Sequence, residues 1–591
     1  MKGQTSTSAL KRFMNKDNTV GHVFAFPFIF GFVCFSLIPV CISFYYAFTN
    51  YSLGSKTAAF IGFKNFLRLF QDEVFLKSLA ITLKYVLISV PLKLTFALLV
   101  AYLLTRPSRM VTFYRSLYYL PSLVGGSVAV ALVWKQLFAR KGLFNSVLAN
   151  MDMSTINWFG NQKLALYPLI LMSVWQFGSS MIIFAAGLKE IPVSYYEAAR
   201  IDGARGYQSF FRITLPCLSP IILYNLIMQT ISAFMAFTQA MIITNGGPNN
   251  STMLYALYVY NQAFKYNDMG YACAMSWFML VVMGLITFII FKTSKFWVFS
   301  EANEAGKEST VMHNRKAVTK VLYHVFVILF GFMMVYPVLW MISGSFKGNA
   351  EILRGTLSLI PKELKLTNYA TGWKGFGGTT FATFFTNSIF ITVIATFGTV
   401  ISSSLVAYAL SRVRFRGRKF WFTCMLVTMM LPTQVIMIPQ YLIYYRLGLV
   451  PGYVPLILPY FCGQAFFIYQ MMQFMQGIPK DLDEAATIDG CSKYQIYSRI
   501  ILPLMKPSIV TTVIIQFYWK WDDYMGPLLY LSRPQSYTVS IAIKLFADSA
   551  STTDYGAMFA MSTLSLIPVF LIFLFFNRYL VQGIGTSGLK G

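Results

Sequence analysis

The sequence predicts an all-α polytopic membrane protein with about 12 transmembrane helices in two parallel repeats of six. Of its 591 residues, 56% are hydrophobic and 12% are charged, whereas about a quarter of the residues in a soluble protein are charged. Twelve apolar segments reach the length of about 20 residues that a bilayer-spanning helix needs. A charged segment at 197–216 also recurs at 484–503 in the same register.

The apolar segments define the expected spans in chain order. The first six are near 22–49, 78–105, 112–138, 163–188, 215–244 and 270–295, and the second six are near 318–346, 383–411, 419–445, 452–476, 502–531 and 556–581. The first segment is longer than the roughly 7 to 15 residues of a signal-peptide core, so we expect it to remain in the protein as a span.

The basic residues between the spans predict the orientation. They are more numerous on the side of the N-terminus, most densely at Arg412, Arg414, Arg416, Arg418 and Lys419. Positive residues stay in the cytoplasm, so both termini and both charged repeats are expected there. The net charge of +27 is spread along these membrane edges. Such a distribution favours contact with the lipid bilayer and its anionic headgroups, and no nucleic-acid partner.

The repeat indicates two halves of common origin. An offset of 287 residues relates the following pairs: Pro192 and Pro479, Glu197 and Glu484, Gly203 and Gly490, Pro216 and Pro503. Because six spans is an even number, both halves share one orientation and form a parallel repeat. We expect a first half at 1–299 with its core at about 78–295, a flexible cytoplasmic linker at 300–320, and a second half at 321–591 with its core at about 383–581.

The linker contains Met312, where a sequence resembling a new N-terminus begins. A fusion of two subunits at this point is one hypothesis, and the sequence leaves open whether that fusion is natural.

The charged repeat predicts a short helix, a turn and a second short helix. A proline can end the preceding span, and capping boxes are expected at Ser194–Glu197 and Asp481–Glu484. Each copy then has a glycine that permits a sharp bend. A single copy would be an ordinary capped loop, but two copies in one register favour a docking element.

The pattern E-A-A, three residues, G, nine residues, I, one residue, L-P is similar to the EAA loop of membrane subunits of binding-protein-dependent ABC importers. The first half resembles the larger permease of maltose-type carbohydrate importers, with "TNGGP" at 244–248. The second half resembles the smaller permease, with "SGSFK" at 343–347 and "WKWDDYMGPLL" at 519–529. The large periplasmic domain of some maltose-type subunits is missing from the first half.

The resemblance implies a type I ABC importer permease fold in a bacterial plasma (inner) membrane. It implies two ABC ATPase subunits, which carry the ATP and magnesium, an extracytoplasmic solute-binding protein, and a carbohydrate substrate such as an oligosaccharide, a disaccharide or a related polyol. The ATPase-coupling positions would be Glu197, Ala198, Ala199, Asp202, Gly203, Glu484, Ala485, Ala486, Asp489 and Gly490. The sequence does not identify the sugar, the ATPase or the binding protein.

Polar positions in the spans suggest a substrate pathway. Spacings of i, i+3, i+4 and i+7 place two sets of residues on two helix faces, and the resemblance makes both faces candidates for the sugar site. The candidates are Met172, Trp175, Gln176, Ser179, Gln229, Ser232, Ala233 and Ala236, with Gln516 equivalent to Gln229. Hydrogen bonding between helices is the alternative role for the Gln and Ser residues. Lys520 with Asp522 or Asp523 could be a gate ion pair or an interfacial anchor, and of the two we expect the anchor.

The sequence lacks the residues that other classes of membrane protein need for their function. A secondary transporter is the main alternative, but the middles of the spans have almost no carboxylates to relay ions. An intramembrane enzyme would need a catalytic or metal motif, and neither H-E-x-x-H nor G-x-S-x-G occurs. The phosphate-binding motif G-x-x-x-x-G-K-[ST] is also absent, so we expect a transport component that binds no cofactor, not an enzyme. The seven cysteines and three histidines form no metal-ligand pattern.

Overall fold

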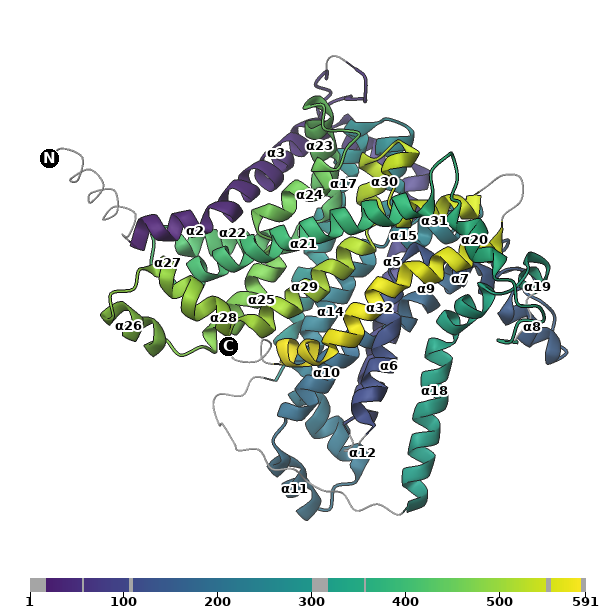
Figure 1. The fold of residues 1–591 in the computed structure, drawn as a ribbon, viewed down its shortest axis with the longest axis horizontal. Helices are drawn as coiled ribbons and strands as arrows, with labels where there is room; N and C mark the ends of the chain where they lie inside the picture. Colours follow the sequence, from purple (N-terminus) through teal and green to yellow (C-terminus); the bar gives the residue numbers. More distant parts are fainter. Residues whose placement is uncertain are drawn as a thin grey trace. The chain divides into compact units, whose positions relative to one another are not determined.

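The computed structural model describes residues 17–55, 58–105, 110–299, 317–354, 358–548 and 554–585. All the regular elements in these ranges are helices, and the β-structure within them is limited to two isolated bridges, Ser52–Asp268 and Phe376–Thr379 (Figure 1). The all-α prediction is therefore confirmed for the described residues. Most of the expected linker, including Met312, lies outside them.

Both halves contain long helices joined by short ones. Up to residue 294 the elements are α2 (Asp17–Phe32), η1 (Val33–Leu37), α3 (Ile38–Ala47), α4 (Lys64–Leu69), α5 (Glu73–Leu103), α6 (Val111–Val124), α7 (Val128–Leu137), α8 (Leu143–Asn150), α9 (Leu166–Trp175), α10 (Gly178–Glu190), α11 (Val193–Ile201), α12 (Gly206–Ser209), η2 (Phe210–Thr214), α13 (Leu215–Cys217), α14 (Ser219–Phe234), α15 (Thr238–Ile243), α16 (Tyr255–Tyr260), η3 (Asn261–Lys265) and α17 (Met269–Ser294).

The elements after the linker follow a similar order. They are α18 (Ala317–Gly344), α19 (Asn349–Leu353), α20 (Thr367–Trp373), α21 (Phe381–Arg412), α22 (Arg418–Met430), α23 (Thr433–Arg446), α24 (Val454–Ile457), η4 (Leu458–Cys462), α25 (Ala465–Gln476), α26 (Asp481–Ile488), α27 (Lys493–Gln495), η5 (Ile496–Ile501), α28 (Leu502–Leu504), α29 (Lys506–Trp521), α30 (Met525–Tyr530), η6 (Pro534–Ser536), α31 (Val539–Asp548) and α32 (Tyr555–Gly585).

The predicted number of spans agrees with the structure. Among the described residues, nine helices are long and apolar enough to cross a membrane, and three further helix pairs reach that criterion together but are bent by 96°, 99° and 73°. Counting each bent pair as one span gives 12. The chain is therefore a multi-pass membrane protein.

The bend between α6 and α7 has a local cause in the sequence. Gly125, Gly126 and Ser127 separate the two helices, and the Ser127 hydroxyl caps α7 by accepting a hydrogen bond from the Val130 amide at 3.2 Å. A polar N-cap favours a fresh helix start over continuation of the previous helix. The bend leaves the Gly125 carbonyl outside regular helix, and this carbonyl becomes part of the candidate site.

Packing divides the chain into two compact units that do not follow the order of the sequence. Unit 1 comprises residues 1–49, 376–542 and 567–591, and unit 2 comprises 50–375 and 543–566. The first span of each half is thus assigned to the unit that holds most of the other half. This division by contacts does not coincide with the division by sequence repeat.

Specific contacts hold each exchanged span. In unit 1, α2 packs on α21, and the ring of Phe24 lies 5.3 Å from that of Tyr408 and 5.1 Å from that of Tyr494. In unit 2, α18 packs on α6, where the Tyr118 hydroxyl donates to the Val327 carbonyl at 2.6 Å (Figure 1). Each exchanged span also has a contact of the other kind, since the Arg416 amide donates to Oδ1 of Asn18 on α2 at 2.9 Å and the ring of Phe330 on α18 lies 5.7 Å from that of Tyr118.

A polar network fixes the start of α5, the helix that carries several residues of the candidate site. Asp72 caps this helix by accepting from the amides of Val74 and Phe75 at 2.9 and 3.0 Å, and its second oxygen accepts from the hydroxyls of Tyr258 and Tyr271 at 2.6 and 2.7 Å. Burial raises the pKa of Asp72, but these hydrogen bonds lower it more, so the pKa lies below its ordinary value.

Candidate functional site

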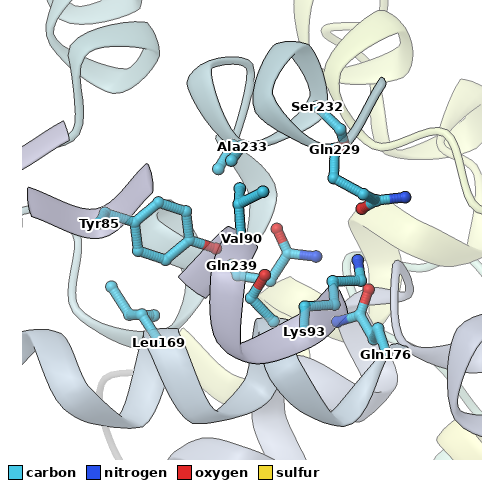
Figure 2. A pocket seen from close by; sticks show the side chains of 11 residues that line it. Tyr85, Val90, Lys93, Leu169, Gln176, Gln229, Ser232, Ala233 and Gln239 are labelled. Atoms are coloured by element: carbon cyan, nitrogen blue, oxygen red, sulfur yellow. The ribbon is translucent and has the colours of Figure 1, made fainter. Parts of the chain in front are cut away.

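A small polar pocket opens within unit 2 between α5, α9, α14 and α15 (Figure 2). Helix α5 contributes an aromatic hydroxyl and a cation, and the other helices contribute amides, hydroxyls and small residues. The lining residues are Tyr85, Val90, Lys93, Leu169, Ser173, Gln176, Gln229, Ser232, Ala233, Ala236 and Gln239. Three glutamines and a lysine in one apolar bundle are costly, and such groups usually mark a transport path or a ligand site.

The structure brings together five of the nine residues that the sequence suggested for the pathway. They are Gln176, Gln229, Ser232, Ala233 and Ala236. The α14 set thus shares the predicted face. Although Ala236 follows the end of that helix, it still reaches the pocket.

The four other candidates lie elsewhere. Helix α9 ends at Trp175, and α10 begins at Gly178, so the continuous face assumed for 172–179 does not exist. Met172 is fully buried, and the Trp175 indole donates to the Met334 carbonyl on α18 at 2.8 Å. The backbone amide of Ser179 donates to the Ser122 hydroxyl at 3.1 Å. Gln516 lies on α29 in unit 1, almost fully buried.

Tyr85, Lys93 and Gln239 line the pocket although no periodic pattern singled them out. Lys93 had one usable signal, since a lysine in a span usually faces a cavity or a partner. Gln239 follows the break after α14, where helical spacing no longer predicts direction. Tyr85 is one of many aromatic residues in the spans, and its sequence neighbours do not distinguish it.

The bend at Gly125 orients two of the pocket glutamines. The Gly125 carbonyl accepts a hydrogen bond from the Gln176 side-chain amide at 3.1 Å and from that of Gln239 at 3.4 Å. A β-carbon on Gly125 would lie 2.4 Å from Cγ of Gln176, so only glycine permits this approach. With both amide nitrogens engaged, the carbonyl oxygens of these two glutamines are available as acceptors.

Unit 1 contains a different polar arrangement. The Lys520 ammonium pairs with the Asp523 carboxylate at 2.8 Å and lies 4.7 Å from the centre of the Tyr460 ring. Only 2% of the Lys520 side chain is exposed. An interfacial anchor would keep its ammonium in water, so the structure favours an internal ion pair with Asp523.

The two charged repeats have nearly identical backbones. Helices α11 and α26 each end at a glycine in the left-handed region, Gly203 with φ 74° and Gly490 with φ 80°. In both, the next amide reaches back five residues, from Ala204 to the Ala199 carbonyl at 2.8 Å and from Cys491 to Ala486 at 2.9 Å. This is the Schellman geometry that stops a helix at glycine.

The expected capping boxes are wrong in position. Helix α11 begins directly after Pro192 and α26 directly after Lys480, and neither start has a side-chain cap. Ser194 and Asp481 therefore lie inside the first turn, because the helices begin earlier than the motif suggested. A capping box occurs instead at the second short helix of the later repeat, where Ser492 and Gln495 exchange hydrogen bonds.

Each loop presents an exposed surface of mixed character. Glu197 and Glu484 are exposed, and so are Ile201 and Ile488, whose relative exposures are 87% and 86%. Ala198, Asp202, Ala485 and Asp489 are also exposed, whereas Ala199 is half-buried and Ala486 is buried. The two loops thus expose the same apolar residue at equivalent positions.

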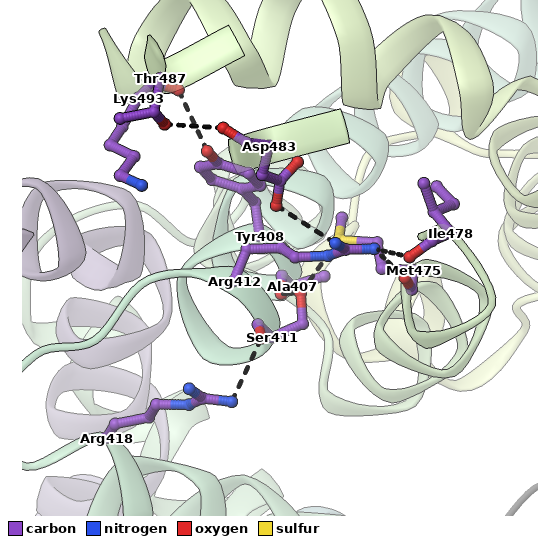
Figure 3. Close-up of polar contacts among 10 residues, drawn as sticks. All are labelled: Ala407, Tyr408, Ser411, Arg412, Arg418, Met475, Ile478, Asp483, Thr487 and Lys493. Atoms are coloured by element: carbon purple, nitrogen blue, oxygen red, sulfur yellow. Dashed lines mark hydrogen bonds and ion pairs between the residues drawn. The ribbon is translucent and has the colours of Figure 1, made fainter. Parts of the chain in front are cut away.

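The later loop is fixed by a buried ion pair (Figure 3). Arg412, at the end of α21, pairs with Asp483 of α26 at 3.2 Å, and their side chains are 3% and 16% exposed. The same guanidinium donates to the carbonyls of Met475 and Ile478, where α25 ends. The arginine thus connects α21, α25 and α26 in one contact.

The earlier loop is fixed by other chemistry. By the 287-residue offset, the equivalent of Asp483 is Tyr196, whose hydroxyl hydrogen-bonds that of Thr214 at 2.8 Å. The two loops therefore share their backbone turn and their exposed positions but differ in the side-chain contacts that hold the first short helix.

A family model described as "Binding-protein-dependent transport system inner membrane component" matches residues 75–298 and again 398–586. The probable ABC transporter permease protein YesP of Bacillus subtilis is 52% identical over 297 residues, which is 50% of this chain and 96% of that protein.

Two further relatives have names that include a sugar. The arabinooligosaccharides transport system permease AraQ of Halalkalibacterium halodurans is 33% identical, over 44% of this chain and 92% of its own length. The lactose transport system permease LacF of Rhizobium radiobacter is 31% identical, over 49% and 98%. The relatives are transport components rather than enzymes, and each matches only about half of this chain. With two matches to one model across most of its length, the chain belongs to the binding-protein-dependent transport system inner membrane component family.

Proposed function

We propose that this chain is the complete permease of an ABC importer for a carbohydrate. Its two halves form the translocation path, both termini are cytoplasmic, and two separate ATPase subunits dock on the loops at 193–204 and 480–491. A binding protein delivers the sugar from outside. The observation that carries this proposal is the pair of loops with the same left-handed glycine and the same exposed isoleucine in one register.

The loops are suited to transmit motion. Each consists of a short helix with an exposed docking surface. The later one is attached to α21 by the Arg412–Asp483 ion pair, and the earlier one bonds through Tyr196 to Thr214 in η2, close to the start of the next span. Closure of the ATPase subunits upon ATP, which binds with magnesium on those subunits, would displace α11 and α26. Because the spans are packed bodies, such a displacement moves them together and exposes the path to alternate sides of the membrane.

The substrate class rests on the relatives and on the pocket. Arabinooligosaccharides and lactose appear in the names of related permeases. The pocket offers amides and hydroxyls at 176, 229, 232 and 239, and these groups can exchange hydrogen bonds with sugar hydroxyls. The pairing of two like loops has no role in a secondary transporter, so that alternative is not favoured.

Reconstitution tests the proposal. The chain would be purified with its ATPase subunits, placed in liposomes and supplied with its binding protein. We expect sugar uptake that requires ATP and all three components, and no nucleotide hydrolysis by the chain alone. Hydrolysis by the pure chain, or uptake driven by an ion gradient without ATP, would contradict it.

A further inference from the structure

Lys93 is a cation in the pocket that has no partner among the described residues. Its side chain is half-buried. The exposed part of the side chain faces the internal pocket, and protein surrounds the rest. Within the described residues it forms no hydrogen bond and no ion pair. Figure 2 shows its ammonium group turned toward the same space as the side-chain amides of Gln176 and Gln229.

Two other lysines inside the spans have partners. The ammonium of Lys84, on the same helix, lies over the ring of Tyr167 at 5.4 Å, and Lys520 pairs with Asp523 at 2.8 Å. Burying a charge without a partner is strongly unfavourable. Of these three lysines, Lys93 is therefore the one whose charge a bound ligand would have to compensate.

The fold does not require a lysine at this position. Thr82 of α5 accepts a hydrogen bond from the Tyr255 amide at 2.8 Å, and Ser388 of α21 accepts one from the Val539 amide at 2.9 Å. Because the two contacts match, Thr82 of the first half and Ser388 of the second half are taken as equivalent positions. Eleven residues farther along the second helix, the position equivalent to Lys93 is Thr399, a small neutral residue. The lysine is thus specific to the first half.

We propose that Lys93 binds a carboxylate of the transported sugar, so that the substrate is an acidic oligosaccharide containing uronate residues. This inference rests on the proposed function and deepens it. The Lys93 ammonium would bind the carboxylate, and the side-chain amide of Gln229, which has no partner among the described residues, would donate a second hydrogen bond. The free carbonyl oxygens of Gln176 and Gln239 would accept from neighbouring sugar hydroxyls.

The chemistry of the pocket agrees with this assignment. A uronate differs from a neutral hexose in having a carboxylate where the neutral sugar has a hydroxymethyl group, so a site for it needs one cation among hydroxyl-binding groups. The pocket has that composition, with no carboxylate among its lining residues to neutralise the lysine. A neutral sugar would leave the ammonium unpaired and desolvated, which costs affinity.

The test measures uptake by the reconstituted complex with its binding protein. The probes are galacturonate and glucuronate oligosaccharides of two to four units, each paired with its carboxyl-reduced neutral counterpart. The variants are Lys93→Met, Lys93→Arg, and Lys84→Met as a control on the same helix. Each variant is compared with wild type on the same probe, so the preference of the binding protein cancels.

We expect the wild type to take up at least one uronate probe in preference to its neutral counterpart. Lys93→Met should lower uronate uptake about tenfold or more, the usual effect of losing a hydrogen bond to a charged group, and should leave its own thermal unfolding midpoint unchanged or higher. Lys93→Arg should retain much of the uptake, and Lys84→Met should not alter the preference.

Three outcomes would overturn the inference while leaving the permease assignment intact. One is uptake of neutral sugars only. The second is an equal effect of Lys93→Met on the uptake of both members of a probe pair. The third is a fall in the thermal midpoint of Lys93→Met with no change in its substrate preference. The second and third would show a structural role for Lys93. ATP-dependent uptake of no carbohydrate at all would instead refute the proposed function.

Discussion

Replacing Gly203 or Gly490 with valine should uncouple ATP hydrolysis from uptake. Both glycines have φ near +75 to +80°, where a residue with a β-carbon costs about 1 to 2 kcal/mol. Apart from the glycine and its two chain neighbours, no heavy atom of the described residues lies within 4 Å of the β-carbon that either substitution would add. The whole cost therefore comes from the backbone turn and not from a clash with the spans.

That cost bears on the position of the coupling helix. A penalty of about 1.4 kcal/mol lowers the population of the native turn about tenfold relative to alternative turns, so the helix would be displaced in much of the population while the spans remain packed. We expect uptake per ATP hydrolysed to fall several-fold in each single variant and further in the double variant. Uptake and binding-protein-stimulated hydrolysis would be measured on the same liposomes.

Matched controls separate the turn from the substitution itself. Gly206 begins α12, two residues after the earlier loop, also has open space at its β-carbon and has an ordinary φ, so Gly206→Val should couple normally. Asparagine tolerates the left-handed region, so Gly203→Asn should lose less than Gly203→Val. Equal coupling in Gly203→Val, Gly490→Val and Gly206→Val would refute the argument.

Three further predictions concern the attachment of the loops and spans. Arg412→Met leaves the mostly buried Asp483 without its partner, so it should destabilise unit 1 by about 3 kcal/mol and lower ATPase retention at the later loop; Arg412→Lys, which keeps the charge, is the control, and an unchanged thermal midpoint in Arg412→Met would count against it. A protease site inserted within 300–316 should leave the two fragments associated after cleavage, since the first span of each half packs in the unit of the other half; separation on a sizing column would contradict this. Asp72→Ala should cost about 1 kcal/mol or more through the lost cap. Because the pKa of folded Asp72 lies below its ordinary value, the wild-type advantage should be full above about pH 4 and vanish as the pH falls through the folded pKa; an advantage that is independent of pH between 3 and 7 would refute that assignment.

The number of spans, the internal repeat and the helix end in each charged loop could be predicted because each is determined mainly by residues close together in the sequence. About 20 apolar residues suffice to predict a span, and a glycine after E-A-A and three residues suffices for the helix end. Residues that line the pocket could be named from the sequence only where the helix that carries them is regular. Helical spacing gave Gln229 and Ser232, but it failed beyond the interruption after Trp175.

The rest depended on contacts between distant segments. Nothing near Lys93 in the sequence shows that it lacks a partner, because the residues that could neutralise it come from other helices. The exchange of first spans between the units is likewise a property of packing, and a hydropathy pattern contains no information about which helix a span contacts. The starts of α11 and α26 were predicted too late because the prediction assumed a side-chain cap, whereas both helices begin without one, directly after Pro192 and Lys480.

The most direct test of the central claim is the stoichiometry of the purified transporter. The chain would be expressed with its ATPase subunit, isolated in mild detergent and weighed by native mass spectrometry. The account predicts one copy of this chain with two ATPase subunits and no other permease, and predicts ATP-dependent uptake by that assembly with its binding protein. A complex with one ATPase subunit, or one that needs a second permease chain for uptake, would contradict it.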